Sequence, residues 1–146
     1  MTRAEGTPTT LVAHSLGCLT AASWLVGQGP GPVVGALLVA VPDPSGPVFP
    51  AAATAGGFRT VRRRLPVPVT VVASNDDPYA TPEWTRELAA TWGAELIEIG
   101  GAGHLNDASG LGTWPEGRRI LRGLMRRTGA AATRSCGAAP ACTRPV

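Results

Sequence analysis

Short apolar runs alternate along the chain with segments whose apolar residues recur at helical spacing. Residues 9–13 (TTLVA), 33–41 (VVGALLVAV) and 67–73 (VPVTVVA) are apolar runs of the kind found in strands covered on both faces. Residues 95–99 (ELIEI) alternate between polar and apolar positions, which predicts a strand nearer the edge of a sheet. The sequence therefore predicts a sheet built from these segments.

The segments that follow the apolar runs have helical patterns. Residues 18–26 keep apolar positions at helical spacing until glycine and proline end the helix. Residues 81–83 (TPE) supply a capping hydroxyl and a proline in the first turn, so another helix is expected to begin there. A final helix is predicted over residues 115–127, with apolar residues on one side and arginines on the other.

Strands that alternate with helices indicate parallel βαβ units. We therefore expect an α/β fold, a three-layer α/β/α arrangement around a mostly parallel sheet, in one domain over residues 1–128. Residues 42–57 are rich in Pro, Ala and Gly and are expected to form a loop or cap segment. Residues 129–146 are expected to form a disordered tail.

The composition is that of a globular protein without a membrane span. Of the 146 residues, 44% are hydrophobic and 16% are charged. No apolar run reaches the ~20 residues needed to cross a bilayer. Residues 1–10 lack the basic start, apolar stretch and cleavage site of a signal peptide, so a cytoplasmic location is expected.

Charge and cysteine content argue against a nucleic-acid partner, a disulfide framework and a zinc site. All 13 basic residues are arginines and the net charge is +3. The run at residues 62–64 (RRR) is therefore expected to be a solvated surface, with no nucleic-acid partner. The cysteines at positions 18, 136 and 142 are odd in number and lack a C-x-x-C or Cys/His pattern, which argues against a disulfide framework or a zinc site.

Polar residues stand directly after three of the predicted strands. Ser15 follows the first strand, Asp77 the third and His104 the fourth. The carboxyl ends of parallel strands face a common crevice at one edge of the sheet. We therefore expect these three side chains to lie close together.

These residue types are the ones that a Ser-His-Asp triad needs. A serine hydroxyl attacks only when a base removes its proton, and an imidazole base needs a carboxylate to hold its tautomer. The chain order Ser, Asp, His is that of α/β-hydrolases. Residues 13–17 (AHSLG) resemble the G-x-S-x-G nucleophile elbow, with Ala13 in the first glycine position. The N–H of Leu16 would then point toward the developing oxyanion.

Each of these residues also has a simpler interpretation. Ser15 could be a helix N-cap, and His104 a loop residue without a partner. Asp77 or its neighbour Asp76 could be a turn former before a proline. His14 occupies the variable position of the elbow and is expected to be structural. The shared edge of the sheet and the chain order favour the triad.

At these residues the sequence resembles a known family. The segments VAHSLGC, SNDDPY and AGHLNDASGLGTWPEG are similar to the small α/β-hydrolase serine hydrolases related to retinoblastoma-binding protein nine, in particular the short bacterial branch, over about residues 9–127. The resemblance implies Ser15 as nucleophile and His104 as base. It implies the second aspartate of the S-x-D-D-P motif, Asp77 rather than Asp76, as the acid. It also implies hydrolysis of an ester or amide through an acyl-enzyme, with no metal and no cofactor.

The chain departs from this family in two ways. Residues 16–20 (LGCLT) end in threonine where the L-x-C-x-E motif has glutamate, so the retinoblastoma partner of the mammalian namesake is not expected. Family members carry a further N-terminal portion with the first strand and a glycine-containing loop that donates the second oxyanion N–H. We therefore expect a partial α/β-hydrolase fold, encoded by a truncated gene or a misplaced start. Leu11 and Val12 would lie on an unpaired edge, through which two copies could pair.

The expected function is hydrolysis of a small ester or amide by a serine hydrolase. An alternative is a catalytically impaired remnant or an interaction module of the same fold. An acyl transferase would use the same triad, because only the accepting nucleophile differs. Tyr79 and Trp114 suggest a small hydrophobic acyl pocket, and the natural substrate is not defined by the sequence. No membrane partner is expected.

Overall fold

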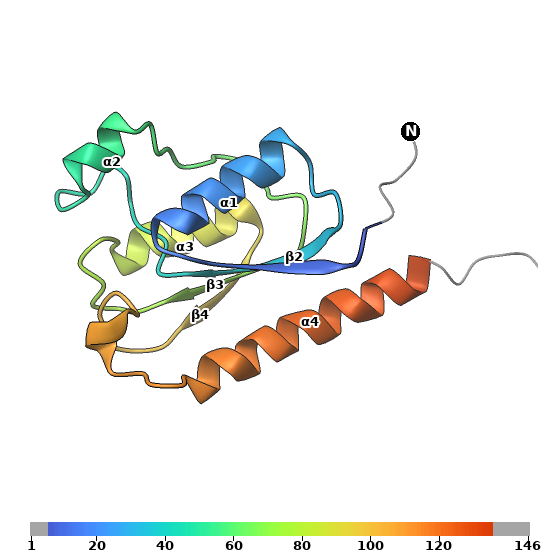
Figure 1. Cartoon of the computed structure of the whole chain (residues 1–146). Helices are drawn as coiled ribbons and strands as arrows, with labels where there is room; N and C mark the ends of the chain where they lie inside the picture. Colours follow the sequence, from blue (N-terminus) through green and yellow to red (C-terminus); the bar gives the residue numbers. More distant parts are fainter. Residues whose placement is uncertain (1–5, 136–146) are drawn as a thin grey trace, which may run out of the picture.

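A four-stranded parallel sheet in the order β1-β2-β3-β4 forms the centre of the molecule (Figure 1). The computed structural model describes residues 6–135. The strands are β1 (Thr9–His14), β2 (Val33–Val39), β3 (Val69–Ala73) and β4 (Glu95–Glu98). All of them match the predicted apolar or alternating segments. β3 is buried along its whole length, whereas β4, the strand with the alternating pattern, lies at an edge.

Helices cover both faces of the sheet, which confirms the predicted three-layer α/β/α fold. α1 (Leu16–Gly27) and α3 (Pro82–Trp92) lie on one face, and α4 (Pro115–Ser135) lies on the other (Figure 1). The sheet separates two apolar clusters. Leu25 and Trp92 pack in the cluster under α1 and α3, and Leu37 and Leu124 pack in the cluster under α4.

The starts and ends of the helices follow from local residues. Thr81 Oγ1 accepts a hydrogen bond of 3.2 Å from the N–H of Trp84, and Pro82 occupies the first turn of α3. α3 ends at Gly93, whose left-handed φ of 65° suits glycine. The segment expected to be a loop or cap contains the short helix α2 (Ala51–Ala55).

The helix α4 continues beyond the predicted end of the domain. Disorder was expected from residue 129 onward, but the helix extends to Ser135. Thr128 is buried and its methyl group packs toward Gly35 of β2, so the helix is still anchored to the sheet at that point. The residues after it include consecutive alanines, which favour helix. Residues 136–146, with Cys136 and Cys142, lie outside the described residues.

The outer edge of β1 has no strand partner among the described residues. Val12 is 57% exposed, whereas Leu11 on the opposite face is half-buried. The predicted unpaired edge is therefore present, and its pairing with a second copy stays a prediction. In the part of the chain that the structure describes, no helix combines the length and apolar character that a bilayer span requires.

Candidate active site

Ser15 lies on a sharp turn between β1 and α1. Its backbone has φ 55° and ψ −128°, a conformation that non-glycine residues rarely adopt. The Ser15 N–H donates a 3.0 Å hydrogen bond to the carbonyl of Val39, so the turn is anchored to the end of β2. The Ser15 side chain makes no capping bond to the helix. The hydroxyl is therefore free for another partner.

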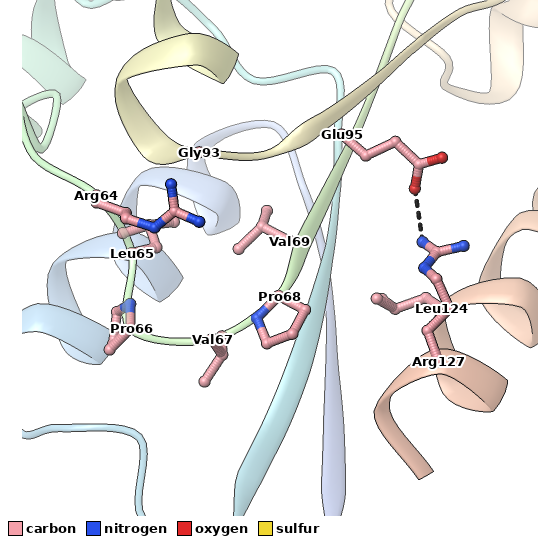
Figure 2. A pocket seen from close by; sticks show the side chains of 10 residues that line it. All are labelled: Arg64, Leu65, Pro66, Val67, Pro68, Val69, Gly93, Glu95, Leu124 and Arg127. Atoms are coloured by element: carbon pink, nitrogen blue, oxygen red, sulfur yellow. Dashed lines mark hydrogen bonds and ion pairs between the residues drawn. The ribbon is translucent and has the colours of Figure 1, made fainter. Parts of the chain in front are cut away.

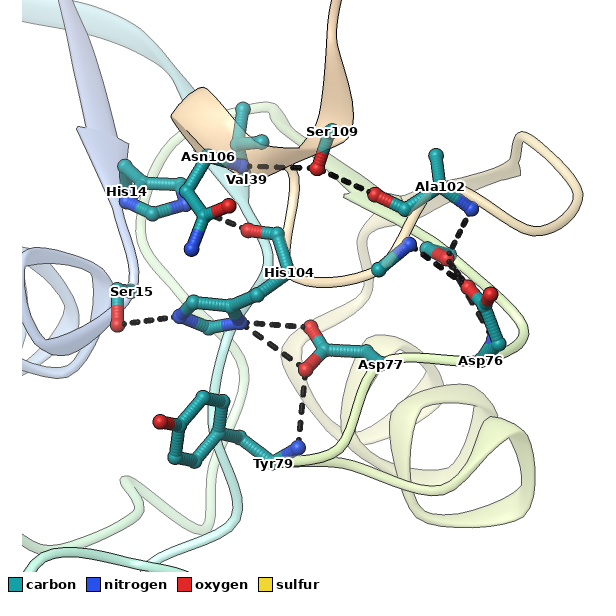
Figure 3. A network of polar contacts seen from close by, with 12 residues as sticks. His14, Ser15, Val39, Asp76, Asp77, Tyr79, Ala102, His104, Asn106 and Ser109 are labelled. Atoms are coloured by element: carbon teal, nitrogen blue, oxygen red, sulfur yellow. Dashed lines mark hydrogen bonds and ion pairs between the residues drawn. The ribbon is translucent and has the colours of Figure 1, made fainter.

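That partner is His104, in the loop between β4 and η1, the 3₁₀ turn at Asp107–Ser109. His104 Nε2 lies 2.8 Å from Ser15 Oγ (Figure 3). His104 Nδ1 lies 3.0 and 2.9 Å from the two carboxylate oxygens of Asp77. The three side chains that the sequence singled out are thus in one hydrogen-bonded series.

The proton positions in this series follow from the chemistry of the groups. An ionised carboxylate only accepts hydrogen bonds, so His104 Nδ1 carries the hydrogen and donates to Asp77. In the neutral ring, His104 Nε2 then has a free lone pair, which faces the Ser15 hydroxyl. The His104 and Asp77 side chains are only 10% and 4% exposed, so little water competes for these bonds.

Asp77 also shapes the turn that follows β3. Its Oδ1 accepts a 2.9 Å hydrogen bond from the N–H of Tyr79. The Tyr79 ring lies 4.5 Å from the His104 ring between centroids, at an angle of 57°. Asp77 is therefore both the turn former of the simpler interpretation and the partner of the imidazole.

Asp76 faces away from the imidazole and holds the loop instead. Asp76 Oδ1 accepts hydrogen bonds from the Ser74 hydroxyl at 2.5 Å and from the Gly103 N–H at 2.8 Å. These bonds, that from Ser74 first, lower the pKa of Asp76 from its ordinary value of 3.8. Ser74 Oγ accepts in turn from the Ala102 N–H at 2.9 Å. The two adjacent aspartates thus have separate partners.

The loop that carries His104 is unusually constrained. Gly103 and Leu105, on either side of it, have left-handed φ values of 57° and 52°. Ser109 Oγ donates to the Ala102 carbonyl at 2.5 Å, which closes the loop on η1. Sequence reasoning missed the roles of Ser74 and Ser109, because no local motif marks a serine that bonds a distant backbone.

His14 belongs to this site as well. Its Nε2 lies 2.8 Å from the His104 carbonyl oxygen, and the two rings are 5.0 Å apart. Figure 3 shows the His104 ring between His14 and Tyr79. The sequence predicted a structural role for His14 and did not identify its partner.

Leu16, the residue expected to donate to an oxyanion, is the first residue of α1. Backbone N–H groups in the first turn of a helix have no acceptor within the helix. The Leu16 N–H therefore has no acceptor within α1 and lies at the positive end of the helix dipole.

Two surface hollows lie along the segment that contains His104 and Leu105. The first, of about 480 Å³, is lined by His104 and Tyr79 together with Ala102, Ala108 and neighbouring residues. The second, of about 570 Å³, is lined by Leu105, Leu111 and Trp114 with polar neighbours. The Trp114 ring packs in the cluster under α4, and its buried Nε1 has no hydrogen-bond partner among the described residues. Tyr79 and Trp114 thus lie in separate hollows rather than in one pocket.

Two arginines of the run, Arg63 and Arg64, lie away from the candidate site. Arg64 lines a hollow of about 400 Å³ near Val69, at the amino-terminal end of β3, together with the ion pair between Glu95 and Arg127 (Figure 2). Arg63 donates to the carbonyl of Val26 near the end of α1. Ser15, Asp77 and His104 follow the opposite, carboxyl ends of the strands, so Arg63 and Arg64 do not reach them.

Cys18 lies on the side of α1 that faces the sheet. It is fully buried, its Sγ donates to the Val39 carbonyl at 3.3 Å, and burial raises the pKa of the thiol to about 12. Within residues 6–135, no three His, Cys, Asp or Glu side chains come together as a metal-ligand group.

A parallel α/β sheet with a serine on a strand-to-helix turn, and with His104 and Asp77 at the strand ends, defines the α/β-hydrolase class of folds. The chain belongs to the serine hydrolase family, whose model matches residues 1–123. A comparison with curated protein sequences found no match.

Solved structures support this fold. A protein from Pectobacterium atrosepticum, described as a YdeN-like hydrolase, is 30% identical, with a TM-score of 0.71 over 83% of this chain. The chain spans 61% of that protein's length. An esterase from a Rhodococcus species is 17% identical, with a TM-score of 0.56, over 81% of this chain and 66% of its own. A protein from Mycobacterium tuberculosis, described as a non-heme bromoperoxidase, is 19% identical, with a TM-score of 0.60. The match covers 83% of this chain and 68% of that protein. At these last two identities the similarity concerns the fold alone.

Proposed function

We propose that this chain carries a Ser-His-Asp triad of Ser15, His104 and Asp77, which hydrolyses a small ester or amide through an acyl-enzyme. The observation that carries the proposal is the continuous series of hydrogen bonds, 2.8 Å from Ser15 to His104 and 2.9 Å from His104 to Asp77. Membership of the serine hydrolase family supports the same reaction class.

In the first step, Ser15 Oγ attacks the carbonyl carbon of the substrate. His104 Nε2 takes the hydroxyl proton as the new C–O bond forms. Asp77 stabilises the resulting imidazolium through the bond to Nδ1 and remains ionised. The carbonyl oxygen becomes an oxyanion, to which the Leu16 N–H donates.

The tetrahedral intermediate then collapses. His104 gives its proton to the leaving alcohol or amine, the C–O or C–N bond of the substrate breaks, and Ser15 is left acylated. A water molecule attacks this ester while His104 Nε2 accepts its proton. The bond between the acyl carbon and Ser15 Oγ then breaks, His104 returns the proton to Oγ, and the carboxylic acid leaves.

The substrate is proposed to be small and partly apolar. The hollow beside His104 measures about 480 Å³ and is lined by Tyr79 and alanine side chains with few charges. We place the chain in the branch related to retinoblastoma-binding protein nine, on the strength of the motifs around Ser15, Asp77 and His104.

Hydrolysis of short-chain p-nitrophenyl esters tests this function. The chain is expected to release nitrophenol, and Ser15→Ala is expected to lower the rate by at least about 10³-fold. Thermal unfolding of both proteins controls for folding. Equal rates for the two would rule out Ser15 as the nucleophile.

A further inference from the structure

A hydrogen bond joins His14 to His104 without involving any reacting group of the proposed triad. His14 Nε2 lies 2.8 Å from the backbone carbonyl oxygen of His104. A carbonyl oxygen only accepts, so His14 Nε2 carries a hydrogen and donates it. His14 is the last residue of β1 and immediately precedes Ser15. The bond therefore ties the strand that carries the nucleophile directly to the loop that carries the base (Figure 3).

Both segments joined by this bond have strained backbones. Ser15 has φ 55°, and Leu105, directly after the base, has φ 52°. Residues with a side chain rarely adopt a positive φ, and such conformations persist only where the surrounding contacts impose them. Hydrogen bonds that fix these two corners therefore decide where the reacting side chains lie.

Two elements hold the loop around His104 from different sides. On the β3 side, Asp76 accepts from the Gly103 N–H at 2.8 Å. On the β1 side, His14 donates to the His104 carbonyl at 2.8 Å. Of these two bonds, only the second connects the loop to β1, the strand whose last residue immediately precedes Ser15. It therefore sets the position of His104 relative to the nucleophile.

We propose that His14 is a positioning residue, whose Nε2–H bond to the His104 carbonyl sets the separation of His104 Nε2 from Ser15 Oγ. This inference rests on the proposed function. A displacement of about 1 Å between reacting groups costs on the order of 10²-fold in rate. Loss of the bond therefore displaces His104 and slows attack by Ser15, while the fold and the three triad residues themselves are retained.

Two variants distinguish the contribution of the His14 N–H donor from that of the ring contact with His104. His14→Gln keeps an N–H at a reach similar to that of Nε2, whereas His14→Phe keeps a ring against His104 and removes the donor. Val12→Ala is the matched control, because Val12 lies on the same face of β1 and is 57% exposed. The measurement is the second-order rate of labelling of Ser15 by a fluorophosphonate, with the melting temperature of each variant.

His14→Phe is expected to label about 10- to 100-fold more slowly than the unmodified chain. His14→Gln is expected to keep most of the labelling rate of the unmodified chain, and Val12→Ala is expected to keep all of it. Unchanged labelling of His14→Phe, or equal slowing of His14→Phe and His14→Gln at unchanged melting temperature, would overturn the proposal.

A second readout does not depend on activity and needs no variant. Long-range ¹H–¹⁵N spectra of the unmodified chain report the tautomer of each histidine ring. His14 is expected to carry its hydrogen on Nε2, and a hydrogen on Nδ1 alone would contradict the bond. If the unmodified chain does not label at all, the proposed function itself fails, and with it the positioning role. If the chain labels normally but His14→Phe does too, only the positioning role fails.

Discussion

Ser15 Oγ and His104 Nε2 lie 2.8 Å apart although 89 positions of the chain separate the two residues. β1 and β4 are at opposite edges of the sheet, and neighbouring strands are about 4.8 Å apart. The loop after β4 must therefore cross the ends of β3 and β2 to bring His104 to Ser15. Hydrogen bonds from each side hold it there, through Asp76 after β3 and His14 at the end of β1.

The separate partners of the two adjacent aspartates predict unequal effects of the same substitution. Asp77→Asn is expected to lower ester hydrolysis by about 10³- to 10⁴-fold, because the amide no longer holds the His104 tautomer. Asp76→Asn keeps an acceptor oxygen for the Gly103 N–H and is expected to cost about 10-fold or less. Steady-state kinetics of both variants decide the matter. Equal losses would contradict the assignment of Asp77 as the acid.

The lowered pKa of Asp76 predicts that part of the stability of the fold is lost in acid. Its hydrogen bonds lower the pKa of the carboxyl in the folded state, so it contributes stability above its unfolded pKa. This contribution is lost as the pH falls through the lowered folded value, below about pH 4. Urea unfolding of the chain and of Asp76→Asn between neutral pH and pH 3 tests this. The stability difference is expected to shrink at the acidic end, and a constant difference would contradict it.

Sequence patterns predicted the strands, because the spacing of apolar residues is a local property. They also predicted that Ser15, Asp77 and His104 lie close together, because each residue directly follows a predicted strand. The same patterns could not order the strands, so the crossing of the His104 loop was not foreseen. Asp76 and Asp77 were distinguished only by a resemblance, since either carboxylate could follow β3 in the same turn. The end of α4 was misplaced, because the contact of Thr128 with Gly35 is tertiary.

Packing around Trp114 predicts opposite effects for two glycines of α4. A Cβ at Gly117 would lie 2.2 Å from the Trp114 ring, whereas a Cβ at Gly123 would meet only the guanidinium groups of Arg127 at 3.6 Å and Arg126 at 3.9 Å. Gly117→Ala is expected to destabilise the fold by about 1–3 kcal/mol. Gly123→Ala is expected to stabilise it by about 0.5–1 kcal/mol, as in an open helix interior.

Chemical unfolding of the two alanine variants distinguishes these effects. A destabilised Gly117→Ala beside a stabilised Gly123→Ala would support the packing of the Trp114 ring against α4. Gly117→Ala as stable as Gly123→Ala would place the ring elsewhere.

The burial of Cys18 predicts an unreactive thiol. Burial raises the pKa of Cys18 from 9.0 to about 12, and alkylation requires the thiolate. Iodoacetamide at about pH 8 is therefore expected to leave Cys18 unmodified in the native chain and to modify it after denaturation. Peptide mass spectrometry locates the adducts. Rapid native labelling of Cys18 would show that α1 does not pack as described.

The most direct test of the triad is a stoichiometric label. A fluorophosphonate reacts with a serine only where a neighbouring base activates the hydroxyl. Intact-mass and peptide analysis of the treated chain is expected to show one adduct per molecule, on the peptide with Ser15. The adduct should be absent from Ser15→Ala and strongly slowed in Asp77→Asn. No adduct on the folded chain, or an adduct that persists in Ser15→Ala, would contradict a triad centred on Ser15.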